Sequence, residues 1–281
     1  MPELPEVETT KEGIKLHLQQ QYISEVIVRN HRLRMPVPDD LAQCCVGKQI
    51  KTVSRRAKYI LIHLSQGYLL VHLGMSGHLR IVPQTQTAEK HDHIDLLLSN
   101  GLILRYCDPR RFGMVFYIDD NPYQHKLLSH LGPEPLTDAF NGNYLLAQAK
   151  NRTMPVKSFI MTNSVVVGVG NIYAAESLYL AGIHPLTPAK NINQQLYAKL
   201  SFYIKEVLAT AIKAGGTTLR DFYAFDGKPG YFSQELKVYG RKNKPCVCCE
   251  TPIDSITIGG RQSSFCTVCQ PYIDYRRGKT E

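Results

Sequence analysis

The sequence predicts a two-domain α+β protein: an antiparallel β-sandwich with a flanking helix, followed by a helical domain that carries a four-cysteine zinc ribbon. Three observations support this prediction. Short strand patterns follow one another closely between residues 22 and 120, helical periodicity runs from about residue 144 to residue 214, and two CxxC pairs lie near the C-terminus. A chain of 281 residues is long enough for two domains with separate cores.

The first ten residues, MPELPEVETT, have the features of a helix entry. A proline and two carboxylates suit the positive end of a helix dipole, and Val7, Ile14 and Leu18 form an apolar stripe at helical spacing. Helix entry alone does not explain why Pro2 and Glu3 stand at the start of the chain.

Two hairpins are predicted in the front half of the chain. Residues 58–73 contain the strand patterns KYILIHL and YLLVHL around a Gln-Gly turn, and residues 93–106 contain HIDLLLS and LILRY around Asn100-Gly101, a strong hairpin signal. Residues 114–119 form a further strand pattern. Strands this close together imply an antiparallel sandwich or barrel.

The pattern changes near HLGPEPL, where two prolines and a glycine mark a hinge or linker. The segments beyond it carry apolar positions at three- and four-residue spacing, as helices do. We therefore expect a β-sandwich domain at residues 1–132, a linker at 133–150, a helical domain at 151–227, and a zinc ribbon with a basic tail at 228–281.

The cysteine spacing predicts a structural zinc site. Cys246 and Cys249 form one CxxC, Cys266 and Cys269 form another, and sixteen residues separate the two pairs, as in a four-cysteine zinc ribbon. Four thiolates close the coordination shell, so the metal would hold the fold and leave no position for a catalytic water. Cys248 is a fifth thiol in this segment, interpreted as a bystander.

Composition narrows the class of protein. The chain is 43% hydrophobic and 20% charged, no apolar run reaches the length of a membrane span, and the acidic N-terminus lacks the apolar core of a signal peptide. We therefore expect a cytoplasmic protein without a membrane partner. The net charge of +9 favours a polyanionic partner, although many basic proteins bind no nucleic acid.

Several loops combine glycine, basic and apolar residues. GVGN directly precedes a helical segment, where backbone N–H groups could bind an anion, although a plain turn explains the glycines equally well. Met75 and Phe112 lie in polar loops and are either wedges for insertion between bases or core residues. Arg261 follows two glycines in a predicted hairpin and is either a phosphate contact or a solvated turn residue.

Taken together, these segments resemble the formamidopyrimidine-DNA glycosylase family, the bifunctional base-excision enzymes that remove oxidised purines. The matching motifs run through nearly the whole chain in the family's order: PELPEVE, RRAKYIL, HLGMSG, KHDHID, DPRRFG, HLGPEPL, GVGNIYAAESL, AGIHP, GGTTLRDF, DGKPGYF, VYGR and the CxxC pair. The resemblance implies a helix–two-turn–helix in the helical domain and double-stranded damaged DNA as the partner, with the protein acting as a monomer.

The resemblance also implies a catalytic set. Pro2, freed by removal of Met1, would attack C1′ of the damaged nucleoside, with Glu3 as general acid/base and Glu6 in support. A terminal amine has a pKa near 8 against about 10.4 for lysine, so more of it is neutral at pH 7. Lys58 corresponds to a family lysine that contacts the phosphate beside the lesion and assists catalysis.

The DNA-binding residues are likewise implied by the resemblance. They comprise phosphate contacts, a lysine near the damaged base, and a triad that fills the void left by a flipped nucleotide. These are, in that order, His72, His91, Asn171 and Arg261; Lys157; and Met75, Arg110 and Phe112. Within the triad, Phe112 would wedge the stack and Arg110 would read the orphan cytosine.

The chain departs from the family pattern in two places. Thr162 stands where the family usually carries an acid, and the sequence continues beyond the second CxxC as PYIDYRRGKTE. The family loop that closes over the extruded base corresponds to residues 217–223.

Two alternatives stay open: an endonuclease VIII-type enzyme that takes oxidised pyrimidines, and a non-catalytic zinc-containing DNA-binding protein. Leu4 and the triad favour the oxidised-purine enzyme.

Overall fold

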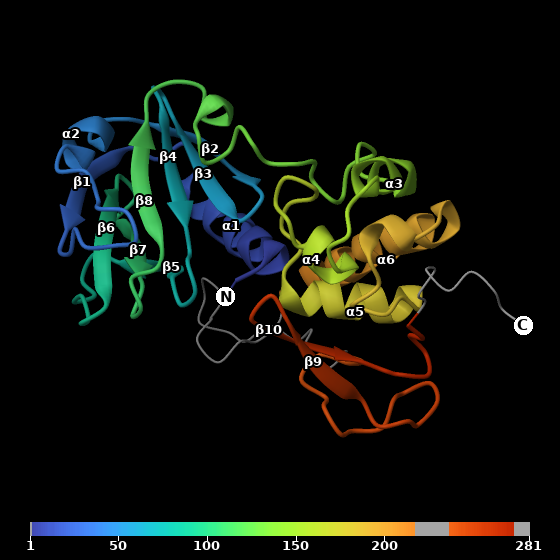
Figure 1. Cartoon of the computed structure of the whole chain (residues 1–281). Helices are drawn as coiled ribbons and strands as arrows, with labels where there is room; N and C mark the ends of the chain where they lie inside the picture. The colour runs from blue at the N-terminus through green and yellow to red at the C-terminus, as the bar shows by residue number, and fades with distance from the viewer. Residues whose placement is uncertain (1, 217–235, 273–281) are drawn as a thin grey trace, which may run out of the picture. The chain divides into compact units, whose positions relative to one another are not determined.

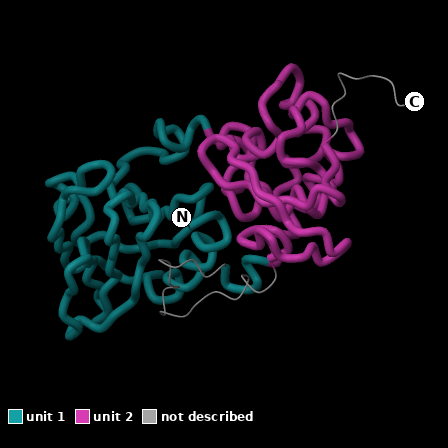
Figure 2. The backbone as a smooth tube through the Cα atoms, turned by 60° about the horizontal axis from the view of Figure 1, so that its bottom comes forward, with its two compact units in different colours: residues 1–130, 211–233 teal, residues 131–210, 234–281 magenta. Residues whose placement is uncertain are grey.

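The computed structural model describes residues 2–216 and 236–272. The chain divides into two compact units, one of residues 1–130 and 211–233 and the other of residues 131–210 and 234–281 (Figure 2). The predicted closing loop at 217–223 and most of the basic tail lie outside the described residues. The four-part domain division expected from the sequence stays a prediction.

Two antiparallel four-stranded sheets build the first unit (Figure 1). The strand order is β1-β6-β7-β5 in one sheet and β2-β3-β4-β8 in the other. Their bounds are β1 (Ile23–Val28), β2 (Ile50–Arg56), β3 (Tyr59–Leu64), β4 (Tyr68–His72), β5 (His78–Pro83), β6 (Asp92–Leu98), β7 (Leu102–Cys107) and β8 (Met114–Ile118). The helical elements of this unit are α1 (Leu4–Leu18), α2 (Leu41–Cys45) and the 3-10 turn η1 (Pro122–Gln124).

One hydrophobic core joins both sheets and α1. Ile62 of β3, Leu96 of β6 and Ile14 of α1 all belong to it and are buried. The predicted stripe of α1 is therefore confirmed as its core face. Because apolar residues of both sheets meet in one core, the antiparallel sandwich is confirmed as well.

Both predicted hairpins form. β3 pairs with β4 with Leu61 opposite Leu70, and β6 pairs with β7 with Leu96 opposite Leu104. Gly101 adopts a φ of +81°, the left-handed conformation that a tight turn at this position requires.

A third hairpin has a turn without a strong sequence signal. Arg56, the last residue of β2, pairs with Tyr59, the first residue of β3, and Ala57 and Lys58 make the two-residue turn between them. Ala57 has a φ of +55°, which is uncommon for a residue with a side chain. The basic segment expected at the front of one strand thus spans the end of one strand and a turn.

The second unit is helical and ends in a small hairpin. Its elements are α3 (Gly142–Ala149), α4 (Val156–Ile160), α5 (Asn171–Ala181), the 3-10 turn η2 (Ala189–Asn191), α6 (Gln194–Lys213), β9 (Asp254–Ile258) and β10 (Arg261–Phe265). The last residues of α6, from Ala211, count with the first unit. Gly182 ends α5 in the left-handed conformation, with a φ of +73°. In the described part of the chain, no helix combines the length and apolarity needed to cross a membrane.

Candidate functional site

Pro2 and Glu3 lie buried directly before the first residue of α1. The backbone N–H of Glu3 donates a hydrogen bond of 2.8 Å to Oε2 of Glu6, and both glutamates are buried within the unit. This contact fixes the chain direction at the N-terminus, because Glu6 is itself held in the first turn of α1. The start of α1 therefore places a secondary-amine residue, two carboxyl groups and the positive end of a helix dipole together.

Gly216 approaches this cluster from the end of α6. It has a φ of +84°, and a Cβ at this position would lie 3.2 Å from Oε1 of Glu6. Any side chain here would be strained in its backbone and would press on the Glu6 carboxylate. The sequence resemblance places a motif, GGTTLRDF, at this position but does not indicate that a side chain on its second glycine would meet Glu6.

The turn that carries Lys58 is tied to α1. Arg55 donates from Nε to Oε2 of Glu8 at 2.6 Å and from Nη1 to the carbonyl of Ala57 at 2.8 Å. Burial alone would raise the pKa of Glu8, but hydrogen bonds from Lys11 and Arg55 hold that pKa below its usual value. A charged Glu8 thus anchors the turn of Lys58 to the helix that follows Glu3.

A buried carboxylate organises the two loops of the predicted base-contacting triad. Asp108 is fully buried and accepts hydrogen bonds from the Ser76 hydroxyl at 2.8 Å, the Tyr106 hydroxyl at 3.1 Å and the Gly113 N–H at 2.8 Å. Ser76 in turn accepts from the Arg110 N–H at 3.1 Å. The loop of Met75 and the loop of Arg110 and Phe112 are therefore held by one charge. Sequence reasoning missed this residue, although it stands in the DPRRFG motif.

Arg110 and Phe112 face away from the core. The Phe112 side chain is 45% exposed, and the Arg110 guanidinium lies 5.0 Å from the centre of its ring. Met75 is partly buried. Phe112 is thus an exposed aromatic stacked under a cation, and its interpretation as a core residue is excluded.

His72 ends β4 beside the Lys58 turn. Its Nδ1 accepts a hydrogen bond of 3.0 Å from the Gly74 N–H, and its ring packs against Tyr59. Burial, together with the positive charges of Lys58 and Arg34, lowers the pKa of His72 to about 4. The ring is therefore neutral at pH 7, and its remaining proton sits on Nε2.

His91 is fixed through its backbone. Its carbonyl accepts from the Asp108 N–H at 3.0 Å. The next residue, Asp92, is buried and accepts from Arg80 Nη2 at 2.7 Å and from the Glu89 N–H at 2.8 Å. The chain on both sides of His91 is therefore anchored, while its ring stays partly exposed.

In the second unit, Lys157 is a buried charged residue that joins separate elements, as Asp108 does in the first unit. Its side chain is buried, and Nζ donates to Asn171 Oδ1 at 2.6 Å, Ser263 Oγ at 2.6 Å and the Gln262 carbonyl at 3.2 Å. Asn171 also donates from Nδ2 to the Gln262 carbonyl at 3.1 Å. One ammonium group thus joins α4, the first residue of α5 and β10.

Arg261 is the first residue of β10 and is exposed. Gly259 and Gly260 form the turn before it with φ values of +55° and +73°. Arg261 lines a cavity of about 250 Å³ together with Lys157 and Thr162. The Thr162 hydroxyl donates to the Ser158 carbonyl at 2.9 Å. The hydroxyl of the threonine that departs from the family pattern therefore has a hydrogen-bond partner in α4.

The four predicted cysteine ligands converge on one point. Their sulfurs all lie within 4.8 Å of one another, and three of the separations are 3.4, 3.5 and 3.8 Å. A tetrahedral zinc with bonds of about 2.3 Å requires sulfurs roughly 3.8 Å apart, so the donor set fits that metal. Cys248 is exposed and stands outside the cluster.

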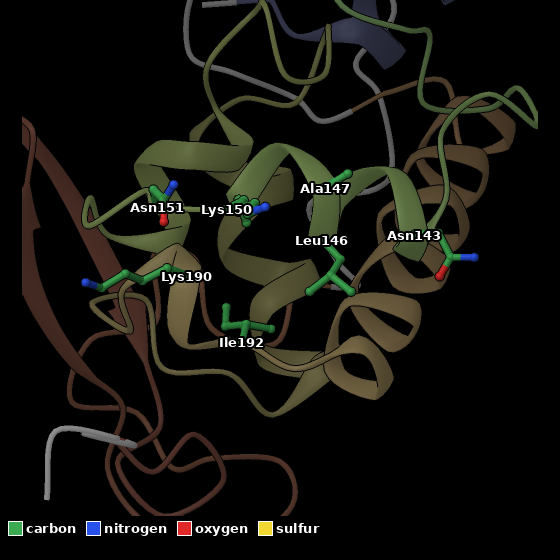
Figure 3. A pocket seen from close by; sticks show the side chains of 8 residues that line it. Asn143, Leu146, Ala147, Lys150, Asn151, Lys190 and Ile192 are labelled. Carbon is green, nitrogen blue, oxygen red and sulfur yellow. The ribbon is translucent and has the colours of Figure 1, made fainter.

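A separate groove of about 530 Å³ lies between α3 and η2 in the second unit (Figure 3). Leu146 and Ile192 contribute apolar surface, and Lys150, Asn151 and Lys190 contribute polar groups. None of the predicted site residues lines this groove. It therefore plays no part in the site built above.

Comparisons with known proteins cover nearly the whole chain. The family model of the formamidopyrimidine-DNA glycosylase N-terminal domain matches residues 1–115, and that of the formamidopyrimidine-DNA glycosylase H2TH domain matches residues 131–223. A formamidopyrimidine-DNA glycosylase of Legionella pneumophila is 62% identical over 273 residues, which are 97% of this chain and all of the relative. One from Hydrogenovibrio crunogenus is 52% identical, with 98% of each chain covered.

Solved structures agree with these sequence matches. The MutM (Fpg) protein of Thermus thermophilus has a TM-score of 0.86 at 34% identity, over 97% of this chain and 100% of that chain. Lactococcus lactis Fpg in complex with DNA containing an abasic site has a TM-score of 0.89 at 32% identity, over 96% of this chain and 99% of that chain. A Lactococcus lactis Fpg mutant bound to Fapy-dG DNA has a TM-score of 0.90 at 32% identity, over 96% and 100% of the two chains.

Proposed function

Because this chain belongs to the formamidopyrimidine-DNA glycosylase family, we infer that it is a DNA glycosylase and AP lyase of base excision repair that removes oxidised purines from duplex DNA. Its substrates are 8-oxoguanine and formamidopyrimidines. The observation that carries the mechanism is the buried Pro2–Glu3 pair at the start of α1. The known structures of relatives with Fapy-dG and abasic-site DNA support the choice of substrate.

The first step is attack by the Pro2 nitrogen on C1′ of the damaged nucleoside. It requires removal of Met1, since an amide nitrogen is not a nucleophile. Burial and the positive end of α1 both disfavour a charged amine at this position and so favour the neutral, reactive form. A bond forms between the Pro2 nitrogen and C1′, the bond from C1′ to the base breaks, and the base leaves with a proton.

Glu3 supports the opening of the sugar. As general acid it protonates O4′ while the C1′–O4′ bond breaks, which leaves an iminium between Pro2 and C1′. Because Pro2 is a secondary amine, its iminium nitrogen bears no hydrogen, and the positive charge cannot be lost by deprotonation of nitrogen. It therefore acidifies the C2′ hydrogen, and loss of that proton expels the 3′ phosphate. A second elimination expels the 5′ phosphate and leaves a one-nucleotide gap.

The loops around Asp108 hold the DNA open. Met75, Arg110 and Phe112 fill the space of the flipped nucleotide, with Phe112 entering the stack and Arg110 facing the orphan cytosine. The exposure of Phe112 supports this role. Filling the void offsets the few kcal/mol that extrusion of a base costs.

Phosphate contacts come from both units. In the first, His72 donates from Nε2 as a neutral ring, His91 makes a further phosphate contact, and Lys58 supplies a positive charge next to the lesion. In the second, Asn171 and Arg261 contact the backbone. Because Lys157 is buried under both segments, its role is to position Asn171 and β10. Phosphate contacts of this kind fix register without reading sequence.

One zinc ion completes the second unit, bound by Cys246, Cys249, Cys266 and Cys269. The sulfur separations and the closed four-cysteine set support zinc in a structural role. When bound, the ion holds the ribbon folded, and thereby β10, on which Arg261 stands. We further propose that the enzyme acts as a monomer in the bacterial cytoplasm, on the nucleoid DNA.

Borohydride trapping tests this proposal. Incubation with an 8-oxoguanine·C duplex and borohydride should reduce the iminium and leave a covalent adduct, which peptide mapping should place on Pro2. A matched protein that retains Met1 keeps every side chain but blocks the amine, and it should give neither adduct nor strand cleavage. A dihydrouracil duplex should be a poorer substrate.

Three outcomes would contradict the proposal. An adduct on a lysine would mean that another residue is the nucleophile. Preference for the dihydrouracil duplex would identify an endonuclease VIII-type enzyme. Duplex binding without cleavage by the trimmed protein would leave a non-catalytic DNA-binding protein.

A further inference from the structure

Tyr179 of α5 reaches the cysteine cluster from the helical part of the second unit. Tyr179 is 8% exposed, and it packs with Val238, Cys246 and Ile253 in one small core cluster. The Tyr179 hydroxyl lies 3.1 Å from Sγ of Cys246. Buried tyrosine hydroxyls usually find a hydrogen-bond partner, and here that partner is a predicted metal ligand.

The direction of this hydrogen bond follows from metal binding. A cysteine that binds zinc is a thiolate and carries no proton, so the hydroxyl must be the donor and the sulfur the acceptor. Cys246 is 2% exposed, which leaves little access for a water molecule to replace the hydroxyl. The backbone N–H of Cys248, at 3.4 Å, also points to this sulfur.

We propose that Tyr179 is a positioning residue of the zinc site, which retains the metal by donating a hydrogen bond from its hydroxyl to the Cys246 thiolate. This inference rests on the proposed zinc. Four thiolates around one divalent ion leave a net charge of −2, and a hydrogen bond in a buried site delocalises part of that charge. A thiolate with less free charge is a weaker nucleophile towards protons, oxidants and alkylating reagents.

With this hydrogen bond, α5 contacts the cysteine ribbon near both of its ends. The helix begins at Asn171, which Lys157 joins to β10, and Tyr179 near its other end contacts the first cysteine of the ribbon. The ribbon is therefore held against one helix at two separate points. Outer partners of metal ligands commonly change metal affinity by about 10- to 100-fold.

Tyr179→Phe tests the inference, because it removes only the hydroxyl and keeps the ring in its cluster. The matched control is Tyr197→Phe, since Tyr197 is also buried in the second unit and donates its hydroxyl to the Ala189 carbonyl at 2.8 Å. For the full chain and both variants, zinc content, the rate of zinc transfer to a colorimetric chelator, and the sulfur-to-metal charge-transfer band of the cobalt-substituted protein are measured.

We expect all three proteins to bind one zinc. Tyr179→Phe should release it about tenfold faster than the unmodified chain, with a shifted cobalt charge-transfer band, while Tyr197→Phe should match the unmodified chain. Equal release rates and identical spectra for Tyr179→Phe would overturn the inference. Equal acceleration by both variants would also overturn it, because general loosening would then explain the loss. An unmodified chain without zinc, and without a cobalt spectrum, would instead overturn the zinc site itself.

Discussion

The two units hold their proposed DNA contacts with buried charges of opposite sign. In the first unit, the carboxylate of Asp108 accepts three hydrogen bonds and joins the loops of Met75 and Phe112. In the second, the ammonium of Lys157 donates three and joins Asn171 to β10. Each charge is buried and joins separate segments that carry the proposed contact residues.

The difference lies in what supports each charge. The donors to Asp108 come from the strands and loops of one β-sandwich. The acceptors of Lys157 include Gln262 and Ser263, which belong to the hairpin of the cysteine ribbon. We therefore expect metal removal to loosen the contacts of the second unit while those of the first persist. The contact residues of one unit can therefore lose their ordered arrangement while those of the other unit keep theirs.

The strongest way to break this comparison is Lys157→Met. The substitution keeps the volume but leaves the buried Ser263 hydroxyl and the partly buried Asn171 amide oxygen without their donor, at a cost of about 1–3 kcal/mol for the buried group. Affinity for an abasic-site duplex should fall on the order of 100-fold, measured by fluorescence anisotropy. Lys150→Met, at an exposed lysine of the same unit, should change affinity little. Unchanged binding by Lys157→Met would refute the positioning role.

A smaller effect is expected from Asp108→Asn. One carboxylate oxygen accepts from Ser76 and the other from Tyr106 and Gly113. An amide nitrogen facing Gly113 would set two donors against each other, and one facing Ser76 would leave that hydroxyl without its acceptor. Excision of 8-oxoguanine should slow by about tenfold, since one unmet hydrogen bond costs roughly 1–3 kcal/mol. Cleavage of a preformed abasic site, which needs less base extrusion, should change less. Asp120→Asn, at an exposed position, is the control. Equal slowing of both reactions would argue for a catalytic or global defect.

The smallest expected effect is on the pH dependence of stability, and it comes from a residue of the first unit. His72 has a folded-state pKa of about 4, so between that pH and its ordinary pKa near 6.5 the unfolded chain binds a proton that the folded chain does not. Stability from this residue is therefore present above pH 6.5 and is lost as pH falls towards 4. His72→Gln should flatten the pH dependence of the urea midpoint in that window. An unchanged slope, or the same flattening in His130→Gln, would contradict the assignment.

Most of the architecture is predictable because its signals are local. The Asn100-Gly101 turn, the apolar stripe of α1 and the two CxxC pairs each lie within a few residues, and each gives the expected element. The turn at Ala57 lacks such a signal, since alanine rarely adopts a positive φ and only the sheet pairing imposes it.

The buried hydrogen bonds that position the site residues cannot be predicted in this way. Lys157 finds its acceptors in Gln262 and Ser263, 105 and 106 residues along the chain, and no periodicity connects them. The resemblance places Lys157 near the damaged base, which stays a prediction, but it does not indicate that the side chain is buried against Asn171 and Ser263. Likewise, the motif that contains Asp108 draws attention to Arg110 and Phe112, which are exposed, and away from the carboxylate beneath them.

The position of Gly216 close to Glu6 bears on how the protein is made. The first compact unit takes in a late stretch beginning at Ala211, so a ribosome has synthesised the whole intervening helical segment before that stretch emerges. During synthesis, the N-terminal residues that we propose to carry the nucleophile are therefore made long before Gly216, which completes their surroundings. A gene fragment cut after residue 130 would encode the sandwich without that neighbour, which makes the two units poor candidates for separate inheritance.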